Sequence, residues 1–128
     1  MLVPEDLQHA LTFDGPELVI VPRQCTPLAM VLQELVSNSM KHGAFSTKGG
    51  TVRLDWSVDS GADGRQLAVR WTERGGPNVE KPGASGTGLE LVRGIVSTDL
   101  KGTLELTFPR EGASHTIRFP LEEADGSL

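Results

Sequence analysis

Cysteine is nearly missing from this chain. Cys25 is the only cysteine among 128 residues, so an internal disulfide is excluded. Unpaired cysteine is usual in reducing compartments, and we therefore expect a cytoplasmic location. Cys25 stands just before a predicted helix and is interpreted as an ordinary small residue.

Long apolar runs and an excess of basic residues are also missing. No stretch of about 18 apolar residues is present, which argues against a membrane span. The start lacks the basic and apolar segments of a signal peptide, so we expect none. The net charge is −5, from 12 Lys and Arg against 17 Asp and Glu. An acidic chain without runs of like charge is not typical of proteins that bind nucleic acids or membrane surfaces.

Several chemical signatures are missing as well. His and Cys do not recur at the spacing of metal ligands, so zinc is not expected. No Gly-Lys-Ser/Thr of a Walker A loop occurs, and the glycines of residues 83–88 do not have the spacing of a dinucleotide-binding fingerprint. No Ser/His/Asp arrangement has a recognisable context. Any nucleotide chemistry must therefore rest on other residues.

The composition, 38% hydrophobic and 23% charged, is that of one ordinary globular domain. We expect a lead-in over residues 1–14 with at most one short element, a folded domain over residues 15–121, and a flexible tail over residues 122–128. Apolar residues with helical spacing predict a first helix, which begins with Thr26 as N-cap and Pro27 at its first position and ends at Gly43.

Alternating apolar residues predict strands on both sides of that helix. The expected elements are a strand over 17–21, a hairpin over 51–58 and 67–71 with its turn at 59–65, a mobile loop over 74–87, a second helix over 88–98, and a final hairpin over 103–108 and 114–119. Two helices on one face of a mixed, mostly antiparallel sheet form a two-layer α/β sandwich of the α+β kind.

Polar residues share one face of the first predicted helix. Glu34, Asn38 and either Lys41 or His42 recur at i, i+4 and i+7 or i+8. An amide oxygen such as that of Asn38 suits magnesium, which takes its other ligands from water and phosphates. Lys41 can neutralise phosphate charge, and Glu34 could orient or deprotonate an attacking group. The alternative is a solvated helix face held by i,i+4 pairs.

A second polar segment follows the predicted hairpin. Glu73 ends a strand before Gly75 and Gly76, and a carboxylate there can accept a hydrogen bond from an exocyclic amine such as that of adenine. The glycines of residues 83–88 open the second helix, whose free N–H groups can bind an anion. The alternatives are a surface Glu before a turn and a flexible loop. Together with the first helix, this segment predicts a site for ATP and magnesium.

Three segments, taken together, resemble the catalytic ATP-binding domain of HWE-type sensor histidine kinases, which belong to the GHKL group with gyrase and MutL. These segments are Leu32 to Phe45, Trp71 to Pro77 and Gly86 to Leu91. His42 is similar to the histidine of the first HWE box, and Trp71 and Glu73 are similar to its Trp-x-Glu. The resemblance covers roughly residues 15–121.

The resemblance implies a Bergerat fold, with ATP bound under a flexible lid formed by residues 76–87. It implies that Asn38 holds magnesium, with Glu34 as a second catalytic residue one turn earlier. A hydroxyl group of the last box is matched to Ser114 or Thr116. The nucleotide contacts that the resemblance implies are Lys41, His42, Trp71, Glu73, Gly75, Gly86, Thr87, Gly88 and Leu89.

The resemblance also implies a reaction and partners. The γ-phosphoryl group of ATP would pass to a histidine on a separate dimerisation domain and then to a response regulator. The sequence shows no pair of long helices for such a domain, so it looks like a catalytic domain alone, and its oligomeric state, monomer included, stays open. The alternative is a regulatory GHKL module, either an anti-sigma-like serine kinase or a degenerate partner-binding domain. The Trp-x-Glu box disfavours a gyrase-like ATPase.

Overall fold

The computed structural model describes residues 3–62, 64–77 and 87–123, without the side chain of Thr87. Its elements in chain order are the 3-10 helix η1 (Glu5–Ala10), β1 (Leu11–Asp14), α1 (Pro22–His42), the 3-10 turn η2 (Ala44–Ser46), β2 (Thr51–Gly61), β3 (Gly64–Arg74), α2 (Thr87–Gly94), the π-helical turn η3 (Ile95–Asp99), β4 (Thr103–Thr107) and β5 (Ser114–Pro120). No helix in these ranges is long and apolar enough to cross a membrane.

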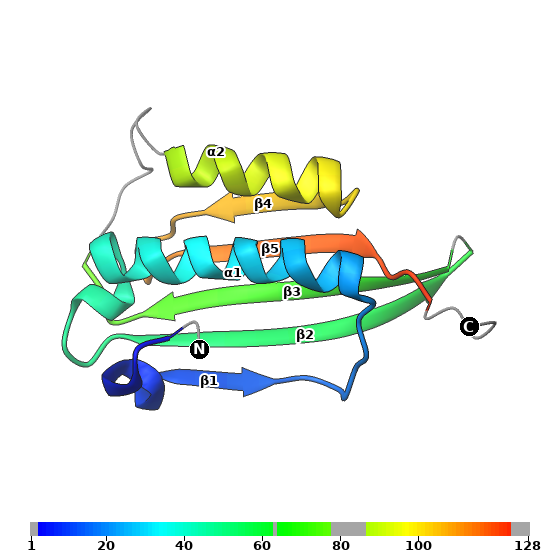
Figure 1. The fold of residues 1–128 in the computed structure, drawn as a ribbon. Helices are drawn as coiled ribbons and strands as arrows, with labels where there is room; N and C mark the ends of the chain where they lie inside the picture. Colours follow the sequence, from blue (N-terminus) through cyan, green and yellow to red (C-terminus); the bar gives the residue numbers. More distant parts are fainter. Residues whose placement is uncertain (1–2, 63, 78–86, 124–128) are drawn as a thin grey trace.

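The five strands form one mixed sheet in the order β1-β2-β3-β5-β4. Strand β1 runs parallel to β2, whereas the other three neighbouring pairs are antiparallel. Figure 1 shows α1 and α2 side by side on one face of this sheet. The predicted fold class, a two-layer sandwich with a mostly antiparallel sheet, is confirmed.

Strand register separates an apolar face from a polar one. Leu54, Trp71 and His115 are register partners in neighbouring strands, so their side chains point to the same side, toward the helices. This row lies beneath α1, whose buried residues include Val31 and Leu35. The alternating pattern over residues 51–58 and 67–71 therefore predicts the core face of the first hairpin, which the structure confirms.

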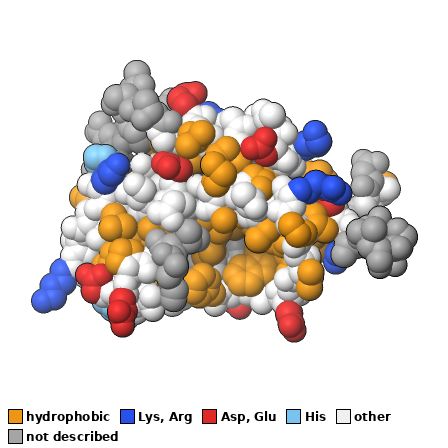
Figure 2. Space-filling model, viewed as in Figure 1, with side chains coloured by type: hydrophobic (Ala, Val, Ile, Leu, Met, Phe, Trp, Pro, Cys, Tyr) orange, Lys and Arg blue, Asp and Glu red, His pale blue; other side chains and the backbone are white. Residues whose placement is uncertain are grey.

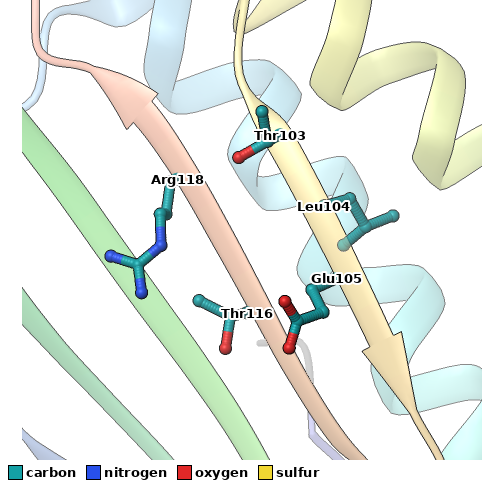
Figure 3. Close-up of a pocket in the computed structure, with 5 residues that line it drawn as sticks. All are labelled: Thr103, Leu104, Glu105, Thr116 and Arg118. Carbon is teal, nitrogen blue, oxygen red and sulfur yellow. The ribbon is translucent and has the colours of Figure 1, made fainter.

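The other face of the sheet carries mostly polar side chains. Arg53 lies 2.9 Å from Asp14 on this face, and both side chains are more than half exposed. Figure 3 shows a shallow hollow on it between β4 and β5, lined by Thr103, Leu104, Glu105, Thr116 and Arg118. Exposed ion pairs contribute little to stability, so the sheet is stabilised mainly by the core that packs on its other face.

Part of the helix side is not covered by either helix. Figure 2, viewed as Figure 1, shows hydrophobic side chains gathered over the β1 and β2 side of the molecule. Leu18, Ile20 and Trp56 are partly buried against the core here, while Phe13 and Val19 are 63% and 79% exposed. The segment between β1 and α1 thus partly takes the place of a third covering element.

The predicted strand over residues 17–21 is wrong, and the lead-in holds two elements rather than one. Residues 15–21 have no regular structure, and the edge strand is β1, which pairs Leu11–Asp14 with residues 52–55 of β2. The indole N–H of Trp56 donates to Pro16 O at 2.8 Å, and a Cβ on Gly15 would overlap the Trp56 ring. The apolar run of 17–21 packs by its side chains without pairing its backbone.

The start of α1 also differs from its prediction. The helix begins at Pro22, with Val21 as N-cap, and Pro27 lies inside it rather than at its first position. The buried side chain of Gln24 explains the extra turn, because its amide donates to Pro120 O at 2.8 Å and its oxygen accepts from Glu122 N at 3.0 Å. These bonds tie the first turn to the chain after β5. The predicted end at Gly43 is confirmed.

The remaining elements agree closely with the sequence. Strand β2 extends beyond its predicted end to Gly61, and β3 begins before its predicted start, at Gly64. Gly64 has φ of +103°. The second helix becomes π-helical at Ile95, with Leu100 N bonded to Ile95 O. The predicted final hairpin and its turn are confirmed, since Gly112 N donates to Pro109 O at 3.0 Å. Most of the predicted lid and tail, residues 78–86 and 124–128, lie outside the described residues.

Candidate functional site

The termini of three elements that are far apart in the sequence lie at one end of the molecule. Figure 1 places the C-terminus of α1, the N-terminus of α2 and the C-terminus of β3 together at the left. The sequence-predicted site residues of the described segments come from these three ends. The fold therefore brings together the two polar segments that the sequence singled out.

Glu34 and Asn38 face the first turn of α2. Both side chains are half-buried on α1. A Cβ placed on Gly88 would lie 2.7 Å from Glu34 Oε2 and 3.7 Å from Asn38 Oδ1. Glycine at position 88 thus allows the two helices to approach closely, and it leaves a carboxylate and an amide oxygen beside the N-terminus of α2.

The first turn of α2 supplies the other half of this junction. Its N–H groups lack partners inside the helix and carry the positive end of the helix dipole, which attracts anions. Leu89 follows Gly88 and is half-buried. The predicted contacts at Gly86 and at the Thr87 side chain lie outside what the structure describes. Because the carboxylate of Glu34 lies next to this helix N-terminus, the junction favours an anion that is bound together with a cation.

Lys41 and His42 lie in the last turn of α1, and both are exposed. Among the hydrogen bonds and ion pairs of the described residues, none connects either side chain to Glu34 or Asn38. The ammonium group of Lys41 and the imidazole of His42 are both accessible to solvent at the same end of the molecule. The structure thus places them near the junction in the fold without fixing their side chains to it.

Glu73 is the most enclosed charged residue of the site, with only 5% of its surface exposed. Its Oε1 accepts from Ser39 Oγ at 3.1 Å and from Ala44 N at 2.7 Å. Its Oε2 accepts from Trp71 Nε1 at 2.8 Å. A buried carboxylate is costly unless it is hydrogen-bonded, and here donors from α1, η2 and β3 satisfy three of its acceptor positions.

Glycines allow the chain to close around this carboxylate. A Cβ on Gly43 would overlap Glu73 Oε1, and a Cβ on Gly76 would lie 2.7 Å from Ala44 N. Gly75 has φ of +77°, a conformation that favours glycine, so the unusual backbone expected after Glu73 is confirmed. Close backbone packing at 43 and 76 is what brings Ala44 N within reach of the carboxylate.

Sequence reasoning missed Ser39 and Ala44. Ser39 is 1% exposed, and besides donating to Glu73 it accepts from Phe45 N at 3.1 Å. A signal was present, because position 39 continues the apolar stripe of Leu35 and Val36 by i+4 and i+3, and a serine on a buried stripe needs a partner. Ala44 contributes only its backbone N–H, which no side-chain pattern could reveal.

Ser114 and Thr116 do not lie on the Glu73 side of the sheet. Ser114 is the register partner of Thr72, and Thr116 of Arg70, so both point to the polar face. The backbone partner of Glu73 is Ala113, the residue before β5, whose carbonyl accepts from Glu73 N at 2.8 Å. Neither hydroxyl therefore lies beside Glu73, because one residue along a strand reverses the face, and the match to the last box stays a prediction.

His115 is buried next to Trp71. It is 4% exposed, in register with Trp71, and its ring meets that of Phe108 edge to face at 5.2 Å. Its Nδ1 has no hydrogen-bond partner among the described residues. Desolvation by burial lowers the pKa of His115 to about 4, although a contact with the Ser114 backbone acts the other way. His115 is thus a neutral core residue at neutral pH.

Solved structures that are similar to this chain include domains of histidine kinases. The catalytic domain of the histidine kinase ThkA aligns with a TM-score of 0.69 at 17% identity, over 91% of this chain and 84% of that one. The histidine kinase domain of an Erythrobacter litoralis blue-light activated histidine kinase aligns with a TM-score of 0.63 at 23% identity, over 91% of this chain and 57% of that one. At these identities the likeness establishes the fold.

The sequence establishes the family. Residues 24–123 match the family described as histidine kinase-, DNA gyrase B-, and HSP90-like ATPases, and the chain belongs to that family. It is 34% identical to the blue-light-activated histidine kinase of Brucella anthropi over 113 residues, 88% of this chain and 23% of that protein. It is 31% identical to blue-light-activated histidine kinase 1 of Erythrobacter litoralis, over 90% of this chain and 31% of that protein. The chain spans about a quarter to a third of these relatives.

Proposed function

We propose that this chain is the ATP-binding catalytic domain of a two-component histidine kinase. It would act in the cytoplasm and transfer the γ-phosphoryl group of ATP to a histidine on a separate dimerisation domain, from which a response regulator takes it. The family supports ATP as the nucleotide, and the two similar relatives are named histidine kinases. The observation that carries the proposal is the contact of Glu34 and Asn38 with the first turn of α2 at Gly88.

The residues of this junction fit magnesium. Asn38 Oδ1 is a neutral oxygen and Glu34 a carboxylate, and magnesium prefers oxygen ligands while keeping several waters. Asn38 would hold the ion, which when bound neutralises charge on the phosphates. The N–H groups of the first turn of α2, with Gly88, would bind phosphate oxygens directly. Lys41, exposed in the last turn of α1, would add positive charge on the same side, and His42 next to it would lie near the phosphates.

Phosphoryl transfer depends mainly on positioning of the reacting groups and on neutralisation of the phosphate charge. In phosphoryl transfer the bond from the γ-phosphorus to the β,γ-bridging oxygen breaks as a bond to the attacking nitrogen forms, and ADP leaves. Glu34, next to Asn38 on α1, would orient the attacking imidazole or take its proton. Glu73 would accept a hydrogen bond from the amine of adenine, with Trp71, Gly75 and Leu89 shaping the pocket. The acceptor imidazole would come from the partner domain.

Nucleotide binding by the Asn38→Ala variant tests the proposal. Titration calorimetry with a non-hydrolysable ATP analogue should show binding to the wild-type chain that is stronger with magnesium. In Asn38→Ala the magnesium-dependent part should be lost, a fall in affinity of roughly tenfold or more for a metal ligand. Gln33→Ala is the matched control, because it removes an exposed amide from the same helix. Equal magnesium dependence in wild type and Asn38→Ala would refute the assignment.

The alternative that the sequence leaves open is a regulatory serine kinase. The phosphorylated product separates the two, because phosphohistidine is labile to acid whereas phosphoserine is stable. When the chain is joined to its phosphoacceptor domain and given ATP, we expect acid-labile phosphate on that domain. Acid-stable phosphate on a partner would favour the serine kinase. The pairing of Glu34 with Asn38 favours an active domain over a degenerate binding module.

A further inference from the structure

The two residues of the Trp-x-Glu segment are hydrogen-bonded to each other. Trp71 and Glu73 are two apart on β3, so both side chains point toward the helices. Trp71 Nε1 donates to Glu73 Oε2 at 2.8 Å, and the residues are 2% and 5% exposed. A donor to a buried carboxylate is among the stronger hydrogen bonds in proteins. Trp71 is therefore more than an apolar core residue.

The hydrogen bonds to Glu73 leave one acceptor position free. An ionised carboxylate has about four such positions, two on each oxygen. Oε1 takes two donors, Ser39 Oγ and Ala44 N, and is thereby filled. Among the described residues, Oε2 accepts only the indole N–H and keeps one position. With both oxygens held from different elements, the carboxylate cannot rotate without breaking a bond.

The indole is itself fixed in place. The ring of Phe45 meets the Trp71 ring edge to face, with centroids 6.5 Å apart and planes at 88°. Phe45 N is held in turn by Ser39 Oγ, the same hydroxyl that donates to Glu73. Trp71, Ser39 and Phe45 thus form one buried network around the carboxylate. Such networks hold side-chain orientation when every member has its partners.

We propose that Trp71 is a positioning residue for purine selection. The indole N–H fills one acceptor position of Glu73 Oε2 and leaves the other for the base. The base must then supply a hydrogen-bond donor at that position. A 6-amino purine can donate there, whereas a 6-oxo purine presents a second acceptor to a carboxylate and is rejected. The proposal rests on the proposed function, because it assumes that Glu73 receives the base. It adds that the choice between bases depends on the indole N–H.

Two tryptophan-to-phenylalanine variants test the proposal. Trp71→Phe removes the N–H donor and keeps an aromatic ring. Trp56→Phe is the matched control, since its indole also donates one hydrogen bond at 2.8 Å, but to Pro16 O in the segment between β1 and α1. Calorimetry would compare non-hydrolysable ATP with the corresponding inosine nucleotide for both variants. These ligands differ at the 6-position of the base and share the same phosphates.

The expected result is a change in selectivity. Trp71→Phe should bind the adenine nucleotide roughly tenfold more weakly, the effect of one hydrogen bond to a charged group, with the inosine nucleotide changed by less than about twofold. Trp56→Phe should keep the wild-type ratio. An unchanged ratio in Trp71→Phe would overturn the inference and leave the nucleotide site standing. If the wild-type chain binds neither nucleotide, the proposed function itself fails.

Nuclear magnetic resonance on the wild-type chain gives a second test that does not depend on a variant folding. The chain has two tryptophans, so its spectrum contains two indole N–H signals, which Trp56→Phe assigns. The Trp71 signal should shift when the adenine nucleotide is added and much less with the inosine nucleotide. The Trp56 signal should stay in place. A Trp71 signal that responds equally to both nucleotides would contradict the role in purine selection.

Discussion

Acidification should destabilise this domain through His115. The imidazole is 4% exposed, and Nδ1 has no partner among the described residues. Burial lowers its pKa from 6.5 to about 4. Between these two values the unfolded chain binds a proton at His115 that the folded chain does not. The free energy of unfolding therefore falls as pH falls, and the loss begins below pH 6.5 and is complete near pH 4.

The size of the effect follows from the same two values. Each pH unit in this window lowers the free energy of unfolding by about 1.4 kcal/mol, a total of about 3 kcal/mol. At pH 5 the loss from His115 alone is about 2 kcal/mol. With a urea slope of about 2 kcal/mol per molar, that corresponds to a lower midpoint by about 1 M. Above pH 6.5 His115 contributes no pH dependence.

Urea unfolding at pH 7.5 and pH 5 measures this loss, with His115→Leu as the reference. Carboxylates also begin to titrate near pH 5, but their contribution is shared by both proteins and cancels in the comparison. The variant keeps an apolar side chain of similar volume in register with Trp71 and removes the titrating ring. We expect the wild type to lose about 2 kcal/mol more than the variant between the two pH values.

A common pH dependence in both proteins would refute the reasoning. It would mean that the His115 ring can be protonated in the folded state at little cost, through water or a partner that reaches Nδ1. A variant that is less stable at pH 7.5 through poorer packing would not affect the test. Only the difference between the two pH values enters it.

Two further variants examine the enclosure of Glu73. Ser39→Ala should lower the free energy of unfolding by about 2–4 kcal/mol, because Phe45 N and Glu73 Oε1 both lose a buried partner. Urea unfolding measures this loss, and a value below about 0.5 kcal/mol would contradict the network. Gly43→Ala should abolish the preference for the adenine over the inosine nucleotide and cost about 1–3 kcal/mol, since the new Cβ overlaps Glu73 Oε1. Gly94→Ala is its control: among the described residues, no atom beyond the helix's own backbone and the chain neighbours lies within 4 Å of the new Cβ. Calorimetry should therefore give unchanged selectivity, and stability should rise by about 0.5–1 kcal/mol on this helical backbone.

Periodicity predicted the elements that form the core. Alternation over residues 51–58 and 67–71 gave the central hairpin and its buried face, and the i, i+3, i+4 pattern gave the buried face of α1. The edge strand was misplaced because residues 17–21 are the more apolar run, although residues 11–14 pair with β2. Both segments suit an edge, and the choice depends on Gly15 and Pro16 packing on Trp56.

The candidate site was predicted in its parts and not in its contacts. Glu34, Asn38 and Glu73 were selected by residue type and spacing, and the structure brings Glu34 and Asn38 against Gly88. The sequence assigned a last-box hydroxyl to Ser114 or Thr116, but the register of β5 turns both away from Glu73. A face assignment depends on register to a single residue, which a loose motif does not fix.

By itself, the sequence determined the fold class, the core faces and the segments that meet at the site, because these depend on side-chain period and on local backbone chemistry. Only the tertiary structure decided how Glu73 is held. Two of its three donors lie 29 and 34 residues earlier at Ala44 and Ser39, and one of these is a backbone N–H that any residue but proline could supply. Such a contact arises from the packing of α1 and η2 against β3, so no pattern within either segment contains it.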